Sequence, residues 1–292
     1  TGTAQSINRQ LAARPGRPIP FIAETGGQNC MVVDSTALPE QVVDDVIASA
    51  FQSAGQRCSA LRVLFIQTDI ADNTLEMLAG AMASIKVGDP RLLCSDLGPV
   101  IDNGARKELQ KHIDRMHKEA TFIASVAIED QCEDGNFIPP HVFEIRSLDQ
   151  LTEEVFGPIL HVIRYSSDQL GAVIQQINDT GYGLTLGIHS RIQAFTETVF
   201  RNTIAGNTYI NRNMVGAVVG VNPFGGRGLS GTGPKAGGPN YLLRFSGPLT
   251  QPETQPETQY AWSIELTPQP RQEKSLVADA TAAMTKWQAT DI

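Results

Sequence analysis

The sequence predicts an α/β fold with a largely parallel β-sheet. Segments with helical spacing of apolar residues alternate with short runs of branched and aromatic residues, which is typical of strands joined by crossover helices. The chain has 292 residues, of which 41% are hydrophobic, so it can bury a large core without disulfides or structural metal. We therefore expect one large globular domain or two smaller ones.

The chain begins with an expected helix, a turn and a strand. Ile7 and Leu11 recur at helical spacing, and Pro15-Gly16 ends the helix. Residues 19–23 form a short apolar run that is compatible with a buried strand. The next helix starts at residue 39, and Gly55 stands where a C-terminal cap belongs.

Later elements continue the alternation. Asp102 can cap a helix that extends to residue 120. His112 and His117 on this helix are five residues apart, so they do not share a helix face and are not expected to bind a metal. The other expected elements are helices at 39–51, 69–85 and 167–178 and strands at 61–67, 121–128, 140–145, 159–165 and 184–189.

The composition excludes several classes of protein. The chain carries 23 Lys and Arg against 31 Asp and Glu, and this net charge of −8 has the wrong sign for nucleic-acid binding. No window approaches the roughly 20 apolar residues of a membrane helix, and the N-terminus lacks the pattern of a secretory signal. The cysteines are irregularly spaced, so we expect neither a disulfide framework nor a metal site, and a cytoplasmic location.

A glycine-rich segment at residues 222–235 formally matches a dinucleotide-binding pattern. It contains Gly226, Gly228 and Gly231 at the required spacing, but Pro234 and Pro239 prevent a helix from starting after it. The Gly-Lys dipeptide of a phosphate-binding Walker loop is absent as well. A glycine-rich connection between closely packed backbones is the better interpretation.

Cys58 has the neighbours of a reactive thiol. It lies at a junction between a helix and a strand, where α/β folds commonly display reactive groups, and Arg57 adjoins it. Most cysteines are buried and inert, so Cys30, Cys94 and Cys132 are expected to be structural.

Two acidic residues are further candidates. Glu24 follows the apolar run at residues 19–23, and it is either an acid on a surface turn or a partly buried base with a raised pKa that can activate water. Glu154 is the second candidate, and the alternative for it is an exposed acid at a helix end.

Together, these residues belong to motifs that resemble the aldehyde dehydrogenase superfamily. Six motifs occur in the order of that family, and chance agreement of all six is negligible. They are Glu24-Thr-Gly-Gly27, Gly55-Gln-Arg-Cys58, Val87-Gly-Asp-Pro90, Glu154-Val-Phe-Gly-Pro158, Gly183-Leu-Thr-Leu-Gly187 and Asn222-Pro-Phe-Gly-Gly226. Finer features resemble the 1-pyrroline-5-carboxylate dehydrogenase branch, namely Gln28-Asn29 after the first motif, Gly216-Ala-Val-Val-Gly220 and Gly231-Thr-Gly-Pro-Lys-Ala-Gly-Gly-Pro239.

The resemblance implies an NAD-dependent oxidation of glutamate γ-semialdehyde to glutamate in proline catabolism. Cys58 as a thiolate would attack the aldehyde, and hydride would pass from the adduct to NAD. Glu24 would activate the water that hydrolyses the resulting thioester. The resemblance implies no metal, and it implies that the parent chain also carries a proline dehydrogenase module.

The resemblance also implies which residues bind the cofactor and the substrate. Thr1, Thr25 and Gly26 would lie in the cofactor site, with Glu154 holding the nicotinamide ribose hydroxyls and Phe156 supporting the cofactor. The α-carboxylate of the substrate would be held by Ser59 and by the backbone amides of Gly216 and Ala217, which can bind a carboxylate without a full positive charge. Phe224 would line the aldehyde tunnel.

Part of the family's pattern stands upstream of the first motif and is not in this sequence. It includes an Asn of the oxyanion hole, a Lys that contacts the cofactor, and most of the nucleotide-binding domain. We therefore expect the isolated chain to lack dehydrogenase activity. The expected divisions are a remnant of the Rossmann-type NAD-binding domain (1–24), the catalytic thiol domain (25–215), a substrate-anchor loop with a return segment (216–248) and a linker with a C-terminal tail (249–292).

Other functions remain open at this point. A dehydrogenase for another semialdehyde differs only in its substrate. An aldehyde dehydrogenase that forms acyl-CoA is less favoured, because such members generally lack the hydrolytic base that Glu24 provides. A non-catalytic oligomerisation module is the alternative from a different class of function. If the chain is part of an enzyme, we expect the parent enzyme to be a homo-oligomer.

Overall fold

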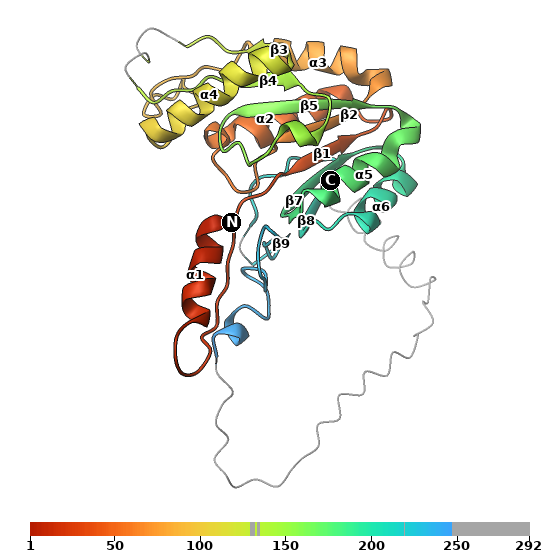
Figure 1. Ribbon diagram of the computed structural model, residues 1–292. Coiled ribbons are helices and arrows are strands. Elements are labelled where there is room, and N and C mark those ends of the chain that lie inside the picture. The colour runs from red at the N-terminus through yellow and green to blue at the C-terminus, as the bar shows by residue number, and fades with distance from the viewer. Residues whose placement is uncertain (129–131, 133–134, 219, 247–292) are drawn as a thin grey trace, which may run out of the picture. The chain divides into compact units, whose positions relative to one another are not determined.

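The computed structural model describes residues 1–128, 132, 135–218 and 220–246 (Figure 1). The chain divides into a compact unit at Thr1–Gly247 and a second unit at Pro248–Ile292, and the fold below is that of the first. The C-terminal tail expected at residues 249–292 lies outside the described residues. The helices are α1 (Gly2–Ala12), α2 (Pro39–Phe51), α3 (Thr68–Met82), α4 (Asn103–Glu119), α5 (Leu170–Asp179) and α6 (Gln193–Asn202).

One seven-stranded sheet forms the centre of this unit. Its order is β3-β4-β5-β2-β1-β7-β8, and the described neighbours pair in parallel except for β3 and β4. The predicted α/β fold with a mostly parallel sheet is therefore confirmed. The strands are β1 (Cys30–Val33), β2 (Val63–Gln67), β3 (Thr121–Ser125), β4 (His141–Glu144), β5 (Ile159–Tyr165), β7 (Thr185–His189) and β8 (Asn207–Ile210), and β6 (Tyr182–Gly183) pairs separately with β9 (Arg227–Gly228).

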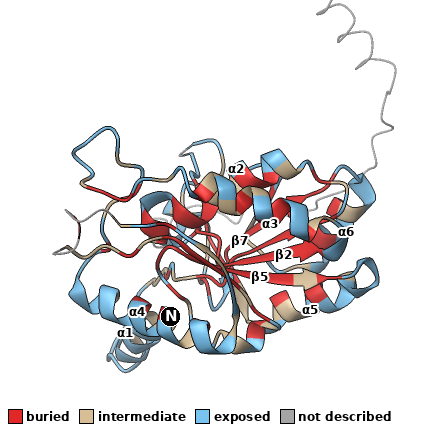
Figure 2. Ribbon diagram, turned by 90° about the horizontal axis from the view of Figure 1, so that it is seen from above, coloured by how far each residue is buried: buried red, intermediate tan, exposed pale blue. Residues whose placement is uncertain are grey.

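Helices cover both faces of the sheet and bury one apolar cluster on each (Figure 2). Successive residues of a strand point to opposite faces, so Met31 and Val33 face α2 and α3, whereas Cys30 and Val32 face α4, α5 and α6. The helices contribute residues at helical spacing to each cluster, among them Val42, Val46, Leu75 and Leu78 on one face and Leu109, Ile113, Val173 and Ile177 on the other.

The helix boundaries follow the signals in the sequence. Asp102 caps α4, because its Oδ1 accepts a hydrogen bond of 2.8 Å from the backbone amide of Ala105. Pro39 occupies the first turn of α2, where its missing N–H has no partner to lose. Five of the described α-helices and strands were not among those expected, namely α6, β1, β6, β8 and β9.

The expectation of a buried strand at residues 19–23 is wrong. Ile19 is 46% exposed, and Glu24 beyond the run makes only an isolated bridge with Gly231. These residues pair with a later segment of chain instead of the sheet: Ala23 accepts from the amide of Thr232, and its own amide donates to the Thr232 hydroxyl. The first strand of the sheet is β1, which follows six residues after Glu24.

One expectation about the cysteines also needs correction. Cys30 and Cys132 are buried, as expected of structural cysteines, but Cys94 is exposed. The reason is local, because Cys94 lies in a loop of turns and bends where the neighbouring Leu93 is fully exposed. Cys94 is therefore a surface thiol and not a core residue.

Candidate active site

The candidate site lies at the amino edge of the parallel strands. Residues 24–29 lead into β1, residues 56–62 into β2 and residues 154–158 into β5, and β7 begins beside them. These strands start at one level, because Cys30 pairs with both Val63 and Leu186 and Val63 pairs with His161. Four segments that are far apart in the sequence therefore meet at one edge of the sheet.

The loop that carries Cys58 begins with an unusual backbone turn. Ser53, Ala54 and Gly55 have φ values of 56°, 52° and 65°. These values lie in the left-handed region, which the backbone of residues other than glycine rarely adopts. A Cβ at Gly55 would also lie 2.2 Å from the carbonyl oxygen of Gly157, so glycine is required there. Since left-handed residues cost free energy, contacts elsewhere must hold this loop in place.

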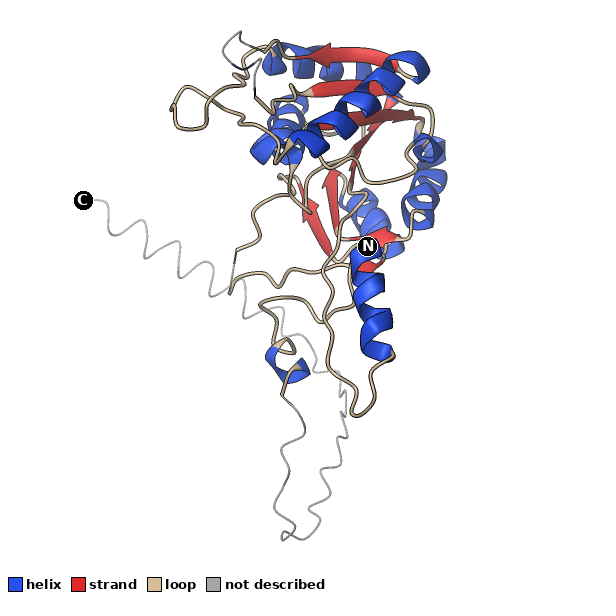
Figure 3. Cartoon of the chain, turned by 60° about the vertical axis from the view of Figure 1, so that its left-hand side comes forward, coloured by secondary structure: helices blue, strands red, loops and turns tan. Residues whose placement is uncertain are grey.

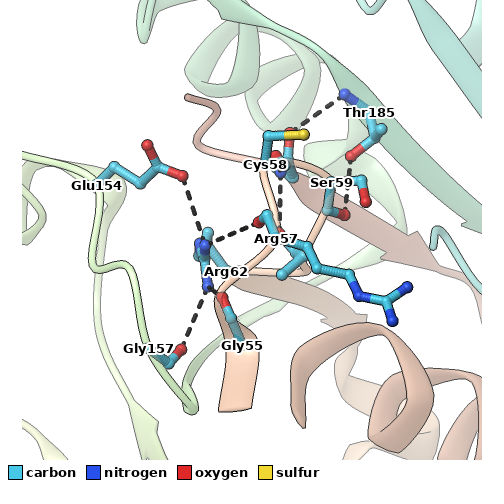
Figure 4. Close-up of polar contacts among 10 residues, drawn as sticks. Gly55, Arg57, Cys58, Ser59, Arg62, Glu154, Gly157 and Thr185 are labelled. Carbon is cyan, nitrogen blue, oxygen red and sulfur yellow. Dashed lines mark hydrogen bonds and ion pairs between the residues drawn. The ribbon is translucent and has the colours of Figure 1, made fainter. Parts of the chain in front are cut away.

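Asn29 supplies the first of these contacts. Its Nδ2 donates to the carbonyl oxygens of Cys58 at 2.7 Å and Ala60 at 2.9 Å, and its Oδ1 accepts from the amide of Thr185 at 3.1 Å. The Thr185 hydroxyl donates to the carbonyl oxygen of Ser59 (Figure 4). One buried amide and one hydroxyl thus fix the backbone at the thiol residue and at the two residues that follow it.

Arg62 supplies the second set of contacts, and its side chain is 1% exposed. Its guanidinium donates to the carbonyl oxygens of Gly55 at 2.7 Å, Arg57 at 3.2 Å and Gly157 at 3.2 Å. It also forms an ion pair with Glu154, where Nη2 and Oε1 are 3.4 Å apart. The sequence reasoning missed Arg62 and Thr185, since no local signal marks contacts between residues so distant in the chain.

The thiol of Cys58 is exposed and stands close to two acids. Burial of part of its surface raises the pKa of the thiol, and the negative charges of Glu154 and Glu24 raise it further. Hydrogen bonds from the backbone at Ser59 and at Cys58 itself act in the opposite direction. Burial and the two acids thus disfavour the thiolate, whereas the backbone hydrogen bonds favour it.

Two of the predicted cofactor residues lie against each other. The Cα of Gly26 packs on the carboxylate of Glu154 so closely that a Cβ at this position would lie 1.7 Å from Oε2. Phe156 is 44% exposed, and the guanidinium carbon of Arg62 lies 5.1 Å from the centre of its ring. The structure thus places Gly26 against Glu154, and both Glu154 and Phe156 against Arg62.

The other two predicted cofactor residues lie at the start of α1. The hydroxyls of Thr1 and Thr25 both donate to the carbonyl oxygen of Leu229, at 3.1 Å and 2.5 Å. Thr1 is the N-cap of α1, yet its side chain makes no capping hydrogen bond. A cavity of about 140 Å³ adjoins them and is lined also by Ala4, Gln5, Asn8, Phe21, Ala23 and Thr232.

The predicted substrate residues are only partly brought to the thiol. Ser59 is buried next to Cys58, whereas Gly216, with φ of 81°, and Ala217 are exposed on a loop. This loop is tied to the thiol loop through Ser49, whose hydroxyl accepts from the amide of Met214 and whose carbonyl oxygen accepts from the amide of Leu61. Phe224 is half-buried and pairs with Ala236 in an antiparallel bridge.

Glu24 is exposed, which differs from the partly buried base considered from the sequence. The difference follows from the missing strand, because residues 19–23 do not enter the sheet and so do not carry Glu24 into the interior. The amide of Thr25 donates to the carbonyl oxygen of Ser230, so the segment around Glu24 lies beside the glycine-rich return segment. Loops run alongside the N-terminal helix in this part of the molecule (Figure 3). Glu24 remains close enough to Cys58 for its charge to affect the thiol.

A pair of imidazoles lies behind the site. Nε2 of His112 and Nε2 of His161 are 2.9 Å apart, Nδ1 of His161 is 3.1 Å from the carbonyl oxygen of Arg62, and Arg115 contacts Nδ1 of His112 at 3.4 Å. A guanidinium can only donate and a carbonyl can only accept. Each ring therefore carries one proton, on Nε2 of His112 and on Nδ1 of His161, and a directed chain of hydrogen bonds runs from Arg115 to Arg62.

This imidazole pair predicts a loss of stability in mild acid. Burial lowers the pKa of His161 from 6.5 to about 3 and that of His112 to about 4, so both rings stay neutral in the folded protein while they protonate in the unfolded chain. The unfolded state then binds more protons below about pH 6.5, and the free energy of unfolding falls as the pH falls. From about pH 7.5 to pH 5 the fully buried His161 alone accounts for about 2 kcal/mol.

The measurement is urea unfolding at these two pH values. His161→Asn keeps a donor for the Arg62 carbonyl oxygen but cannot titrate, so we expect it to lose less stability on acidification than the unchanged protein does. His117→Asn changes an exposed imidazole on α4 and serves as the control. An unchanged pH dependence in His161→Asn would contradict the assignment of a neutral buried ring.

The described part of the chain offers neither a metal-binding cluster nor a membrane-spanning helix. Within residues 1–128, 132, 135–218 and 220–246, no group of three or more His, Cys, Asp or Glu side chains is arranged to hold a metal ion. Among the helices that the structure describes, none has the length and apolar character needed to cross a membrane.

The fold and the site define a class of protein: an α/β domain that presents an exposed thiol, held by buried anchors and flanked by carboxylates, at the amino edge of a parallel sheet. The family model for the aldehyde dehydrogenase family matches residues 1–248. The chain belongs to the aldehyde dehydrogenase family.

Within this family, the chain is similar to PutA proteins and to 1-pyrroline-5-carboxylate dehydrogenases. The chain is 49% identical to the bifunctional protein PutA of Escherichia coli (strain K12) over 99% of its own length and 22% of that protein. A crystal structure of a mutant proline utilization A from Bradyrhizobium japonicum matches 84% of the chain and 25% of its own with a TM-score of 0.81 and 57% identity. A 1-pyrroline-5-carboxylate dehydrogenase from Thermus with bound NAD gives a TM-score of 0.75 and 33% identity, over 84% of this chain and 47% of its own. This chain thus spans about a quarter of the PutA relatives.

Proposed function

We propose that this chain supplies the catalytic thiol domain of an NAD-dependent dehydrogenase that oxidises glutamate γ-semialdehyde to glutamate. The observation that carries the proposal is the Cys58 loop, in which two buried anchors, Asn29 and Arg62, hold an exposed thiol beside Glu154 and Glu24. A structural cysteine needs no such support. The similarity to PutA and to 1-pyrroline-5-carboxylate dehydrogenases indicates the substrate class.

The residues of the site fit NAD. The N-terminus of α1 adjoins the cavity beside Thr1 and Thr25, and a helix N-terminus favours the negative charge of a pyrophosphate. Glu154, with a side chain that is 17% exposed, offers carboxylate oxygens to ribose hydroxyls, and Gly26 leaves the space that its carboxylate needs. When bound there, NAD accepts the hydride of the reaction.

The proposed reaction forms and breaks one bond to Cys58. The Cys58 thiol first gives its proton to solvent, the Sγ thiolate then bonds to the aldehyde carbon, and loss of hydride from that carbon leaves a thioester on Sγ. Glu24 then removes a proton from water as the water oxygen attacks the thioester carbon. The C–S bond breaks, the thiol is restored, and the carboxylate of glutamate leaves.

The remaining assignments concern the substrate and the partner module. We propose that Ser59, Gly216 and Ala217 bind the α-carboxylate and that Phe224 lines the path of the aldehyde. Ser49 supports this arrangement, because it ties the loop that carries Gly216 to the thiol loop. We also propose that the parent protein is a cytoplasmic homo-oligomer in which a proline dehydrogenase module precedes this domain.

The test is NADH formation from glutamate γ-semialdehyde, measured on this chain alone and on a chimera in which it replaces the matching segment of the E. coli PutA relative. We expect the chimera to turn over. We expect the chain alone to form no NADH. Preference for a different semialdehyde would correct the substrate. Absence of turnover in a folded chimera with all semialdehydes tried would refute the catalytic function.

A further inference from the structure

We propose that Arg62 is a positioning residue that couples the carboxylate of Glu154 to the loop that carries Cys58. The inference rests on the proposed function, because that function assigns the cofactor contact to Glu154 and the nucleophile to Cys58. The observation behind it is that one buried guanidinium contacts both parts of the site at once (Figure 4).

The contacts of Arg62 divide between two segments of the chain. On the thiol side, its nitrogens donate to the carbonyl oxygens of Gly55 and Arg57, which stand on both sides of residue 56 and immediately before Cys58. On the other side, they donate to the carbonyl oxygen of Gly157 and pair with Glu154. The two segments lie about a hundred positions apart in the sequence, so no contact between neighbours along the chain can replace Arg62.

The charge balance of Arg62 makes this link sensitive to Glu154. The guanidinium is almost fully buried, and a buried charge is costly unless it is paired. Three carbonyl oxygens and one carboxylate provide the compensation, and Glu154 is the only one of these four partners with a full charge. A change at the Glu154 carboxylate therefore changes how strongly Arg62 is held by the carbonyls before Cys58.

Phe156 strengthens the argument for a coupling. Its ring faces the guanidinium of Arg62, so two of the residues proposed to contact the cofactor, Glu154 and Phe156, touch the same side chain. A group that binds at Glu154 and Phe156 would therefore reach the thiol loop through the Arg62 side chain, in addition to the direct packing of Gly55 against Gly157. The side chain of Arg57 is different, because its Nε donates to the hydroxyl of Ser53 on the exposed side of the loop.

A double-mutant cycle on the reactivity of the thiol tests the coupling. The chimera carrying Cys94→Ser is treated with iodoacetamide across a pH series, and the alkylation rate of Cys58 is measured for Arg62→Lys, Glu154→Gln and the double variant. We expect the double variant to depart from the product of the two single effects by about threefold or more, as coupled neighbours do. Arg57→Lys paired with Glu154→Gln is the matched control and should be multiplicative.

A cycle in which Arg62→Lys and Glu154→Gln multiply like the control pair would overturn the proposal. Alkylation requires neither NAD nor turnover, so this result is separate from any failure of the proposed dehydrogenase function. The cycle compares only variants with the same thermal transition, because a loosened fold would expose Cys58 and so lower the pKa of its thiol without any change in positioning.

A second measurement applies if Arg62→Lys does not fold. Hydrogen exchange of the amide of Ala60, which donates to the carbonyl oxygen of Arg57, reports on the loop in the presence of an intact Arg62. We expect Glu154→Gln to speed this exchange by about threefold or more, whereas Glu24→Gln removes an acid near Cys58 that has no contact with Arg62 and should leave it unchanged. Equal exchange in the two variants would refute the coupling.

Discussion

Replacement of Cys58 by alanine is expected to abolish NADH formation by the chimera. The thiol is the proposed bond-forming atom, and removal of a nucleophile in enzymes of this kind costs about 10³-fold or more in turnover. The loop itself should survive, because Asn29 and Arg62 bind its backbone carbonyl oxygens and not the thiol. The fold of the variant is checked by its thermal transition and the rate by NADH absorbance.

Cys94→Ser is the matched control for this experiment. Cys94 is also exposed, but it lies in the loop of residues 90–96, outside the segments at residues 24–29, 56–62 and 154–158 that form the site. Its replacement should leave the rate within about twofold of the unchanged chimera, as is usual for surface positions. Turnover that survives Cys58→Ala would refute the assignment of the nucleophile.

The sequence was sufficient to predict the fold class and to single out Cys58, Glu24 and Glu154, which lie close together at the candidate site. Regular spacing of apolar residues predicted α2 to α5 and most strands, since the signal for such elements is local. The wrong prediction at residues 19–23 has a physical reason. An apolar run indicates that a segment is shielded from water, but it does not indicate which part of the chain packs against it. The return segment around Thr232 covers it, and that contact spans more than two hundred positions.

The anchors of the thiol loop could not be predicted for a related reason. A buried Arg62 contradicts the usual exposure of arginine, and only the three-dimensional arrangement of Gly55, Gly157 and Glu154 explains it.

The edge of the sheet at which the candidate site lies differs from the one that the fold class favours. Ligands of open parallel sheets commonly lie at the carboxyl ends of strands, whereas Cys58 precedes β2 and Glu154 precedes β5. A general fold rule points to the opposite end of the sheet, whereas the motifs point to residues at the amino edge.

Glu24→Gln is expected to separate the two halves of the reaction. Attack by Cys58 and loss of hydride come before the step that needs a base for water, so the variant should still form about one NADH per site in a rapid burst. Steady-state turnover should then fall by about 10²–10⁴-fold, because the thioester on Cys58 is hydrolysed slowly without proton transfer. Rapid mixing measures the burst, and mass spectrometry of the quenched protein detects the acyl group on Cys58.

The position of Glu24 makes this outcome informative. The side chain is exposed and touches none of the buried anchors, so its replacement by an amide of the same size should not disturb the Cys58 loop. Glu40→Gln, an exposed acid in the first turn of α2, controls for a loss of surface charge and should keep full turnover. A variant of Glu24 that shows no burst would place the residue before hydride transfer instead of after it. A variant with full turnover would show that another group, or water alone, carries out the hydrolysis.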